Sequence, residues 1–213
     1  MSIDAPSPAR ATSRPSSPVL VAVGAAFVLA SAVGGARVWR VPEPARLGTL
    51  PDFRLVERSG RTLSLADLRG RPWVADFIFT QCGGACPAMT GRMARLRREL
   101  PDGVRLVSFT VDPGHDTPEV LAGYARAFGA DERWLFVTGP QKDLYALSVA
   151  GFKLAAMEVP AGERSPGGDG PFLHSSKLTL VDGGGTIRGY YDSTDEEAMR
   201  ALAADATALQ GRR

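Results

Sequence analysis

The 213-residue chain has almost no net charge, because 25 lysines and arginines stand against 23 aspartates and glutamates and leave a formal charge of +2 at pH 7. A protein that follows a nucleic-acid backbone needs a large basic face. The composition excludes such a face, so we expect no nucleic-acid partner. Cysteine and histidine are also scarce, with two of each, and any soft-metal or thiol chemistry has to come from these few residues.

The two cysteines stand close together, and this placement is the most informative feature of the chain. Cys82 and Cys86 follow an apolar run and precede a helical pattern. Two thiols on one loop at the end of a strand can share a soft metal ion or close a disulfide. The alternative is a pair of packed, inert thiols, which Gly83 and Gly84 disfavour because such a loop is poorly suited to burying core side chains. The pattern predicts a redox or metal site.

The longest uncharged run lies near the N-terminus and predicts a membrane anchor. Residues 18–36 form 19 consecutive uncharged positions, enough to span a bilayer core of about 30 Å at about 1.5 Å per residue. Trp39 and flanking arginines then suit a membrane interface. We expect a disordered tail over residues 1–17 and a single transmembrane helix over 18–40. A cleaved secretory signal and a buried core helix remain as alternatives. Arginines on both sides leave the orientation undecided.

The rest of the chain predicts one α/β domain. Prolines mark residues 41–50 as a linker, and the domain covers 51–213. A hairpin is expected over 53–65, buried strands over 73–79 and 104–111, and a short strand over 134–137. Helices are expected over 90–100, 117–128 and 142–149, and a mobile loop over 158–171. A last hairpin, 178–191, leads into a terminal helix with a capping-box pattern at 193–197.

Several motifs together resemble one family. They are Thr80-Gln81-Cys82 with Cys86-Pro87-Ala88-Met89, Val111-Asp112-Pro113 with Asp116-Thr117-Pro118-Glu119-Val120-Leu121, Tyr124 with Phe128-Gly129-Ala130, the run from Trp134 to Gly139, and His174-Ser175. From about residue 50 to 210 the chain resembles the Sco/SenC family of membrane-anchored copper-binding proteins. The resemblance implies a thioredoxin-like α/β fold with an N-terminal β-hairpin, preceded here by the predicted transmembrane helix.

The resemblance also implies a site and a function. In that family two cysteines and a distant histidine bind one copper ion. By position, these ligands correspond here to Cys82, Cys86 and His174. Two thiolates suit Cu(I), and an imidazole also tolerates Cu(II). The implied function is a copper chaperone, not an enzyme, that serves the dinuclear copper site of a cytochrome c oxidase subunit. The domain is expected to face the periplasm, or another extracytoplasmic space, from the inner membrane. Other copper carriers or thioredoxin-like reductants are further expected partners.

Other residues near the motifs receive structural interpretations. His115 is expected to be a solvated turn residue, with accessory metal binding as the alternative, and Asp112 to shape the same turn. Met89 is expected in the core, and His174 could be an ordinary surface histidine. Gly83 stands where the family usually has proline, which leaves the copper affinity and the disulfide potential open. The segment 173–176 lacks the proline that many thioredoxin-like oxidoreductases carry there, which favours metal binding.

Two rival functions use the same cysteines. In a thiol-disulfide reductase acting on the cysteines of a copper-accepting partner, Cys82 would attack and Cys86 would resolve the mixed disulfide, so that the pair is catalytic and His174 dispensable. Peroxidase activity is the third possibility. It ranks last, because the sequence identifies no arginine near the cysteines that could activate a peroxide oxygen.

Overall fold

A strand that is buried along its whole length forms the middle of the structure. It is β4, Trp73–Ile78, and all six residues are buried, as is typical of a strand covered on both faces. The computed structural model describes residues 45–159 and 171–211. In it β4 lies between a parallel neighbour, β5 (Arg105–Thr110), and an antiparallel one, β9 (Lys177–Val181). The predicted buried strands are therefore neighbours.

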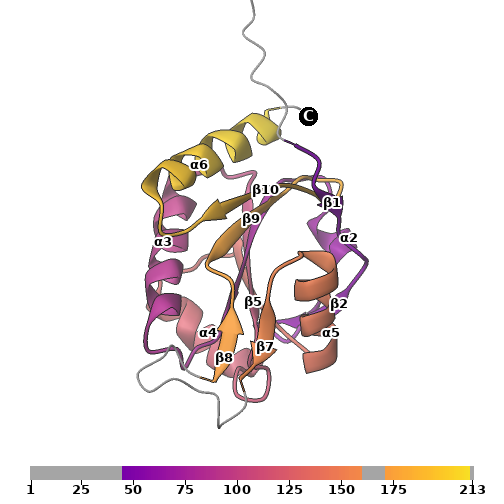
Figure 1. Cartoon of the computed structure of the whole chain (residues 1–213), viewed down its shortest axis with the longest axis vertical. Coiled ribbons are helices and arrows are strands. Elements are labelled where there is room, and N and C mark those ends of the chain that lie inside the picture. Colours follow the sequence, from indigo (N-terminus) through magenta and orange to yellow (C-terminus); the bar gives the residue numbers. More distant parts are fainter. Residues whose placement is uncertain (1–44, 160–170, 212–213) are drawn as a thin grey trace, which may run out of the picture. The chain divides into compact units, whose positions relative to one another are not determined.

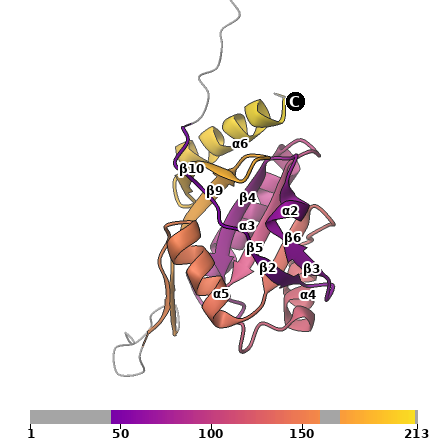
Figure 2. The ribbon, with the colours of Figure 1, turned by 90° about the vertical axis from the view of Figure 1, so that its right-hand side faces the viewer.

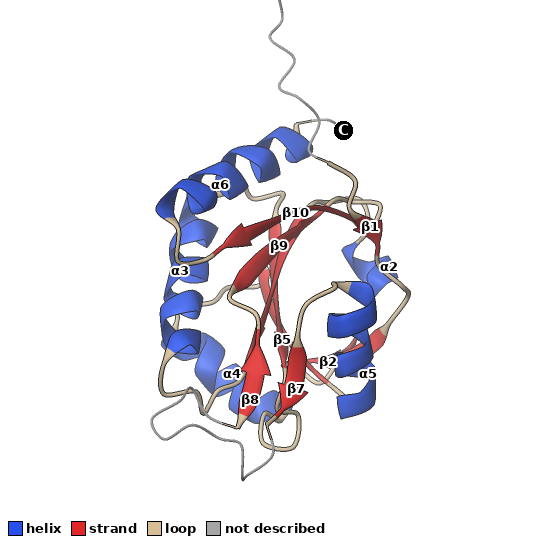
Figure 3. Ribbon diagram, in the orientation of Figure 1, coloured by secondary structure: helices blue, strands red, loops and turns tan. Residues whose placement is uncertain are grey.

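Within the described residues the sheet has eight strands in the order β1-β10-β9-β4-β5-β6-β2-β3. Figure 3 draws the strands in red and the helices in blue. The other strands are β1 (Gly48–Thr49), β2 (Arg54–Glu57), β3 (Thr62–Ser64), β6 (Trp134–Thr138) and β10 (Thr186–Asp192). β4, β5 and β6 run parallel, and the remaining pairs are antiparallel. The carboxyl ends of β4 and β5 consequently meet at one edge of the sheet.

Helices cover both faces of this sheet. They are α2 (Leu65–Leu68), α3 (Ala85–Glu99), α4 (Pro118–Ala127), α5 (Gln141–Ala146), which continues into the π-helical turn η1 (Leu147–Gly151), and α6 (Glu196–Gln210). α3 and α4 lie on one face and α5 on the other (Figures 1 and 2). Thr117 caps α4 by accepting a hydrogen bond from the Val120 amide at 3.3 Å. At α6 the cap is Asp195, which accepts from the amides of Glu197 and Ala198.

Aromatic side chains fill the core between the sheet and α5. The rings of Phe77 and Phe109 stack with centroids 5.4 Å apart, and Phe152 meets Phe77 at 5.3 Å and Trp73 at 6.0 Å. Burying each such side chain stabilises the fold by about 1.5–3 kcal/mol. Because side chains alternate along a strand, Asp76 faces the opposite side, toward α3. The strand thus separates an aromatic layer from the layer that holds the cysteines.

A second, two-stranded sheet replaces part of the predicted loop. β7 (Ala156–Glu158) and β8 (Phe172–His174) pair antiparallel, with Ala156 opposite His174. The Val159 amide donates to the Pro171 carbonyl at 2.7 Å. Of the described residues in the predicted loop, 158–171, only Glu158 belongs to a strand, because β8 begins at Phe172. At Glu158 backbone pairing overrides a composition rich in proline and glycine. Residues 160–170 lie outside the described residues.

The N-terminal predictions are only partly covered by the structure. The predicted tail (1–17) and anchor (18–40) lie outside the described residues, among which no helix is long and apolar enough to span a bilayer. β1 falls within the predicted linker, residues 41–50, and pairs with β10. Leu50 is buried, and its amide donates to the Gly185 carbonyl at 2.9 Å. Residues 48–50 therefore already belong to the sheet.

Candidate metal centre

The two cysteines lie where the segment after β4 enters α3. Cys82 follows the last residue of β4 by four positions, and Cys86 stands in the first turn of α3. Cys82 therefore precedes the helix, which begins at Ala85, and Cys86 lies within it. Their sulfurs are nevertheless associated, because the Cys86 amide donates to Cys82 Sγ at 3.4 Å. An amide of the first helical turn thereby places a partial positive charge at that sulfur.

Both thiols are reduced and shielded from solvent. Cys82 is 5% exposed and Cys86 is fully buried. Burial raises the pKa of the Cys86 thiol far above its usual range, and the hydrogen bond and charge of Cys82 raise it further. Cys86 is therefore protonated in the metal-free protein and has to lose a proton to become a metal ligand.

Polar groups adjoin the buried sulfurs on the α3 and α4 side. The Thr90 and Tyr124 hydroxyls lie 2.9 Å apart. The pKa of Tyr124 is raised, first by burial and then by the charges of Cys86 and Asp76. Asp76 is fully buried, and burial raises the pKa of its carboxyl to about 7. Two thiols, a phenol and a carboxyl therefore share one poorly solvated region.

The third predicted ligand, His174, is the last residue of β8. Its side chain lies outside the described part of the structure. Among the side chains that are described, no three of the types His, Cys, Asp and Glu come together as a metal site. The strand itself passes close to the cysteine segment, because the Phe172 ring contacts that of Phe79 with centroids 5.4 Å apart. The two rings come from β8 and from the residue directly after β4.

The turn after β5 carries the second histidine and a network that the sequence interpretation missed. Asp116 is fully buried, and its carboxylate lies 3.0 Å from His115 Nδ1. Thr80 and Thr110 donate their hydroxyls to the same carboxylate, each at 2.5 Å. His115 is partly exposed, as expected of a turn residue, but it is also tied to this buried acid. The sequence shows polar residues at the carboxyl ends of both β4 and β5, but no local pattern in it pairs Thr80 with Asp116.

The remaining sequence interpretations concern single residues. Asp112 shapes the turn, since its carbonyl accepts from the amides of His115 and Asp116 at 3.2 and 2.8 Å. Met89 is 3% exposed and belongs to the core. At Gly83 a Cβ atom would meet nothing within 4 Å. The surrounding structure therefore does not require glycine at this departure from the family pattern.

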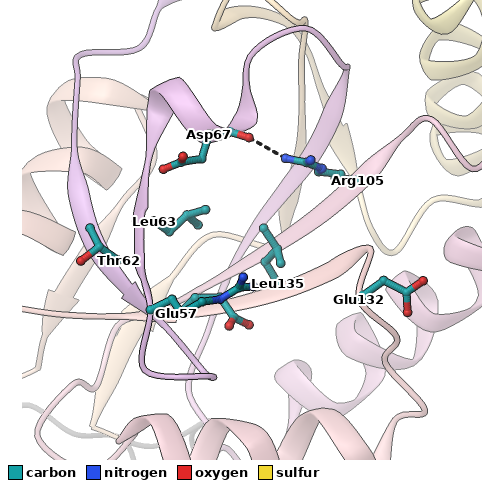
Figure 4. Close-up of a pocket in the computed structure, with 8 residues that line it drawn as sticks. Glu57, Thr62, Leu63, Asp67, Arg105, Glu132 and Leu135 are labelled. Carbon is teal, nitrogen blue, oxygen red and sulfur yellow. Dashed lines mark hydrogen bonds between the residues drawn. The ribbon is translucent and has the colours of Figure 1, made fainter.

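A cavity of about 350 Å³ lies elsewhere in the molecule (Figure 4). Its charged lining includes Glu57, Asp67, Arg105 and Glu132, and Arg105 Nη1 donates to the Asp67 carbonyl at 2.6 Å. Arg105 is the first residue of β5, whereas the cysteines follow the last residue of the parallel strand β4. The cavity therefore lies at the other end of the strands and is no part of the cysteine site.

Comparison with known proteins identifies the family. The family model named SCO1/SenC matches residues 42–209, which is most of the chain. The chain belongs to the SCO1/SenC family. This confirms the resemblance drawn from the motifs around Cys82, Asp116 and His174.

Individual family members agree with this assignment. The SCO1 protein homolog of Bacillus subtilis is 30% identical over 187 residues, covering 85% of this chain and 91% of its own length. A protein of Stutzerimonas stutzeri with the provisional name copper-binding protein is 34% identical over 145 residues, covering 66% of this chain and 68% of its own length. The solved structure of BsSco, described as a Sco-family cytochrome c oxidase assembly protein with a disulfide switch, matches with a TM-score of 0.67, 29% identity and coverage of 80% and 98%. The predicted thioredoxin-like α/β fold matches this structure.

Proposed function

We propose that this protein carries one copper ion as cargo and passes it to the dinuclear copper site of a cytochrome c oxidase subunit. Cys82, Cys86 and His174 hold the ion. Membership of the SCO1/SenC family supports this proposal, as do a relative named for copper binding and a similar structure described as an oxidase assembly protein.

The observation that carries the proposal is the paired, buried sulfurs. Two reduced thiols lie at the start of α3. There the Cys86 amide donates a hydrogen bond to Cys82 Sγ. Soft thiolate ligands favour Cu(I), and one imidazole keeps the site open to Cu(II). The ion displaces the Cys86 proton when it binds, because only the thiolate is a ligand. The ring contact between Phe79 and Phe172 supports an approach of β8, and with it His174, to the sulfurs.

The proposed location combines the predicted anchor with the cysteine chemistry, since the anchor alone does not fix the side of the membrane. A single transmembrane helix over residues 18–40 holds the domain at the extracytoplasmic side of the inner membrane, beside a membrane-bound acceptor. The protein receives the ion from other copper carriers and passes it to the oxidase subunit, in both cases by ligand exchange.

Copper titration of the full chain, purified in detergent with its thiols reduced, tests the proposal. We expect one ion per chain, and an affinity at least about 100-fold lower in Cys82→Ser, Cys86→Ser and His174→Ala. His115→Ala is the matched control, since it removes the only other histidine and retains stoichiometric binding. Binding that is indifferent to all three ligand substitutions would refute the site.

A second candidate function uses the same two sulfurs. The contact between the Cys86 amide and Cys82 Sγ also suits a thiol-disulfide reductase that acts on the cysteines of the copper-accepting partner, with a thioredoxin-like protein as its own reductant. In that case Cys82 attacks the partner's disulfide and Cys86 releases the mixed disulfide. Full reductase activity of His174→Ala toward a disulfide peptide, in a protein that binds no copper, would favour this function over the first.

A further inference from the structure

The carboxylate of Asp116 is a junction between two strand ends. It is fully buried and has four partners, namely the Thr80 amide at 3.1 Å, the Thr80 and Thr110 hydroxyls at 2.5 Å each, and His115 Nδ1 at 3.0 Å. A carboxylate only accepts hydrogen bonds, so these groups are its donors. Such charge-assisted bonds are about twice as strong as neutral ones. The junction therefore ties the segment after β4 to the turn after β5.

The segment between this junction and α3 contains Cys82, whose own amide donates to the Phe79 carbonyl at 3.4 Å. Thr80 is two residues before Cys82, and Gly83 and Gly84 separate Cys82 from the first residue of the helix. Glycine leaves the backbone unusually free. The position of Cys82 relative to Cys86 thus depends on where the segment is fixed at its start, and Asp116 supplies two bonds to Thr80 there.

We propose that Asp116 is a positioning residue that acts through Thr80 to hold Cys82 Sγ beside Cys86. The carboxylate touches neither sulfur and is not itself a ligand. It raises the effective concentration of one thiol at the other, which favours the disulfide when the pair is oxidised. It likewise favours a shared copper ion when the pair is reduced, and this second consequence rests on the proposed function.

The chain offers a matched pair of substitutions to test this. Thr80→Val and Thr110→Val each remove one hydroxyl that donates to the Asp116 carboxylate at the same distance, and the Thr110 hydroxyl also accepts from the Asp112 amide at 2.9 Å. Thr80 belongs to the segment that leads to Cys82, whereas Thr110 is the last residue of β5. If the junction is merely structural, both substitutions should change the Cys82–Cys86 disulfide equilibrium to a similar extent. If it positions Cys82, only Thr80→Val should change that equilibrium.

The experiment measures the equilibrium of the Cys82–Cys86 disulfide with glutathione in the full chain in detergent, free of metal. The chain has no other cysteine, so alkylation of free thiols reports this pair alone. We expect Thr80→Val to lower the equilibrium constant for disulfide formation about tenfold, as expected when roughly one backbone residue is freed. For a two-electron couple this corresponds to about 30 mV. Thr110→Val changes the constant less than about twofold. Both variants lower the urea midpoint, Thr110→Val at least as much as Thr80→Val, because it also removes the acceptor of the Asp112 amide.

Equal effects of the two variants on the glutathione equilibrium, or none from Thr80→Val, would overturn the proposal. Asp116→Asn is expected to lower the equilibrium constant for disulfide formation more than Thr80→Val does. The reason is that the NH₂ group of asparagine would face another hydrogen-bond donor. Should that variant fail to fold, the threonine pair still decides. A protein that binds no copper but shows the difference between Thr80 and Thr110 would refute the copper function and leave the positioning role standing.

Discussion

The buried carboxyl of Asp76 allows a prediction about the pH dependence of stability. Asp76 lies in the middle of β4 and is fully buried. Neither carboxyl oxygen has a hydrogen-bond partner among the described residues. Burial is the largest cause of the rise in its pKa from 3.8 to about 7. The change to make is Asp76→Asn, which keeps the size of the side chain and removes its titration.

The magnitude follows from proton linkage. In the unfolded chain the carboxyl has a pKa near 3.8, whereas in the folded protein it is about 7, so the folded state binds the proton more tightly. Stability from this group is fully present below about pH 4, falls between pH 4 and pH 7, and is completely lost above pH 7. A rise of roughly three units at 1.36 kcal/mol each corresponds to about 4 kcal/mol. Asp76→Asn removes this loss, so its advantage over the wild type grows as the pH rises.

Urea unfolding of the reduced, metal-free protein between pH 4.5 and pH 8.5 measures the effect. We expect the difference in unfolding free energy between Asp76→Asn and wild type to change by several kcal/mol across this range, in favour of the variant at high pH. Asp143→Asn, at an exposed position on α5, controls for the loss of a carboxyl as such. A difference between Asp76→Asn and wild type that stays constant with pH would refute the reasoning.

Three further outcomes are expected. Phe109→Ala removes a ring that contacts Trp73 and Phe77. We expect it to lower the free energy of unfolding by about 3–5 kcal/mol, measured by urea unfolding. A loss below about 1 kcal/mol would contradict the packing described. Asp195→Ala removes the α6 cap and costs about 1 kcal/mol, measured in the same way, and no change would show that the cap is dispensable. Because the pKa of Cys86 is raised, this thiol releases one proton when copper binds, and the copper affinity increases about tenfold per pH unit between pH 6 and pH 8. Competition titrations in which the affinity does not change with pH would contradict proton release from this thiol.

The sequence predicted the order of the elements well, because hydrophobic periodicity is strong where burial is complete. The run from Trp73 to Ile78 shows this most clearly, and the hairpins at β2–β3 and β9–β10 also formed as expected. The start of α3 was misplaced, since glycines and Pro87 masked a helix that begins at Ala85. The β7–β8 pairing was missed because three-residue strands beside a proline- and glycine-rich stretch carry little periodic signal.

The candidate site was only partly predictable for a similar reason. Cys82 and Cys86 stand out because the chain has no other cysteine, and the family pattern points to His174. The Asp116 junction includes the contact of Asp116 with Thr80, which stands 36 positions earlier in the chain. No local pattern encodes such a pairing. Asp76 was hidden for a different reason, since a lone acid in an apolar run shows its importance only once its burial is known.

The most direct test of the central claim is spectroscopic. Cu(II) is added to the full chain, and absorption and electron paramagnetic resonance spectra are recorded for the wild type and for Cys82→Ser, Cys86→Ser, His174→Ala and His115→Ala. We expect an intense thiolate-to-copper charge-transfer band that disappears without either cysteine, changes without His174 and persists without His115. A copper spectrum that lacks this band, or one that His174→Ala leaves unaltered, would contradict the account of a shared site built from two sulfurs and one imidazole.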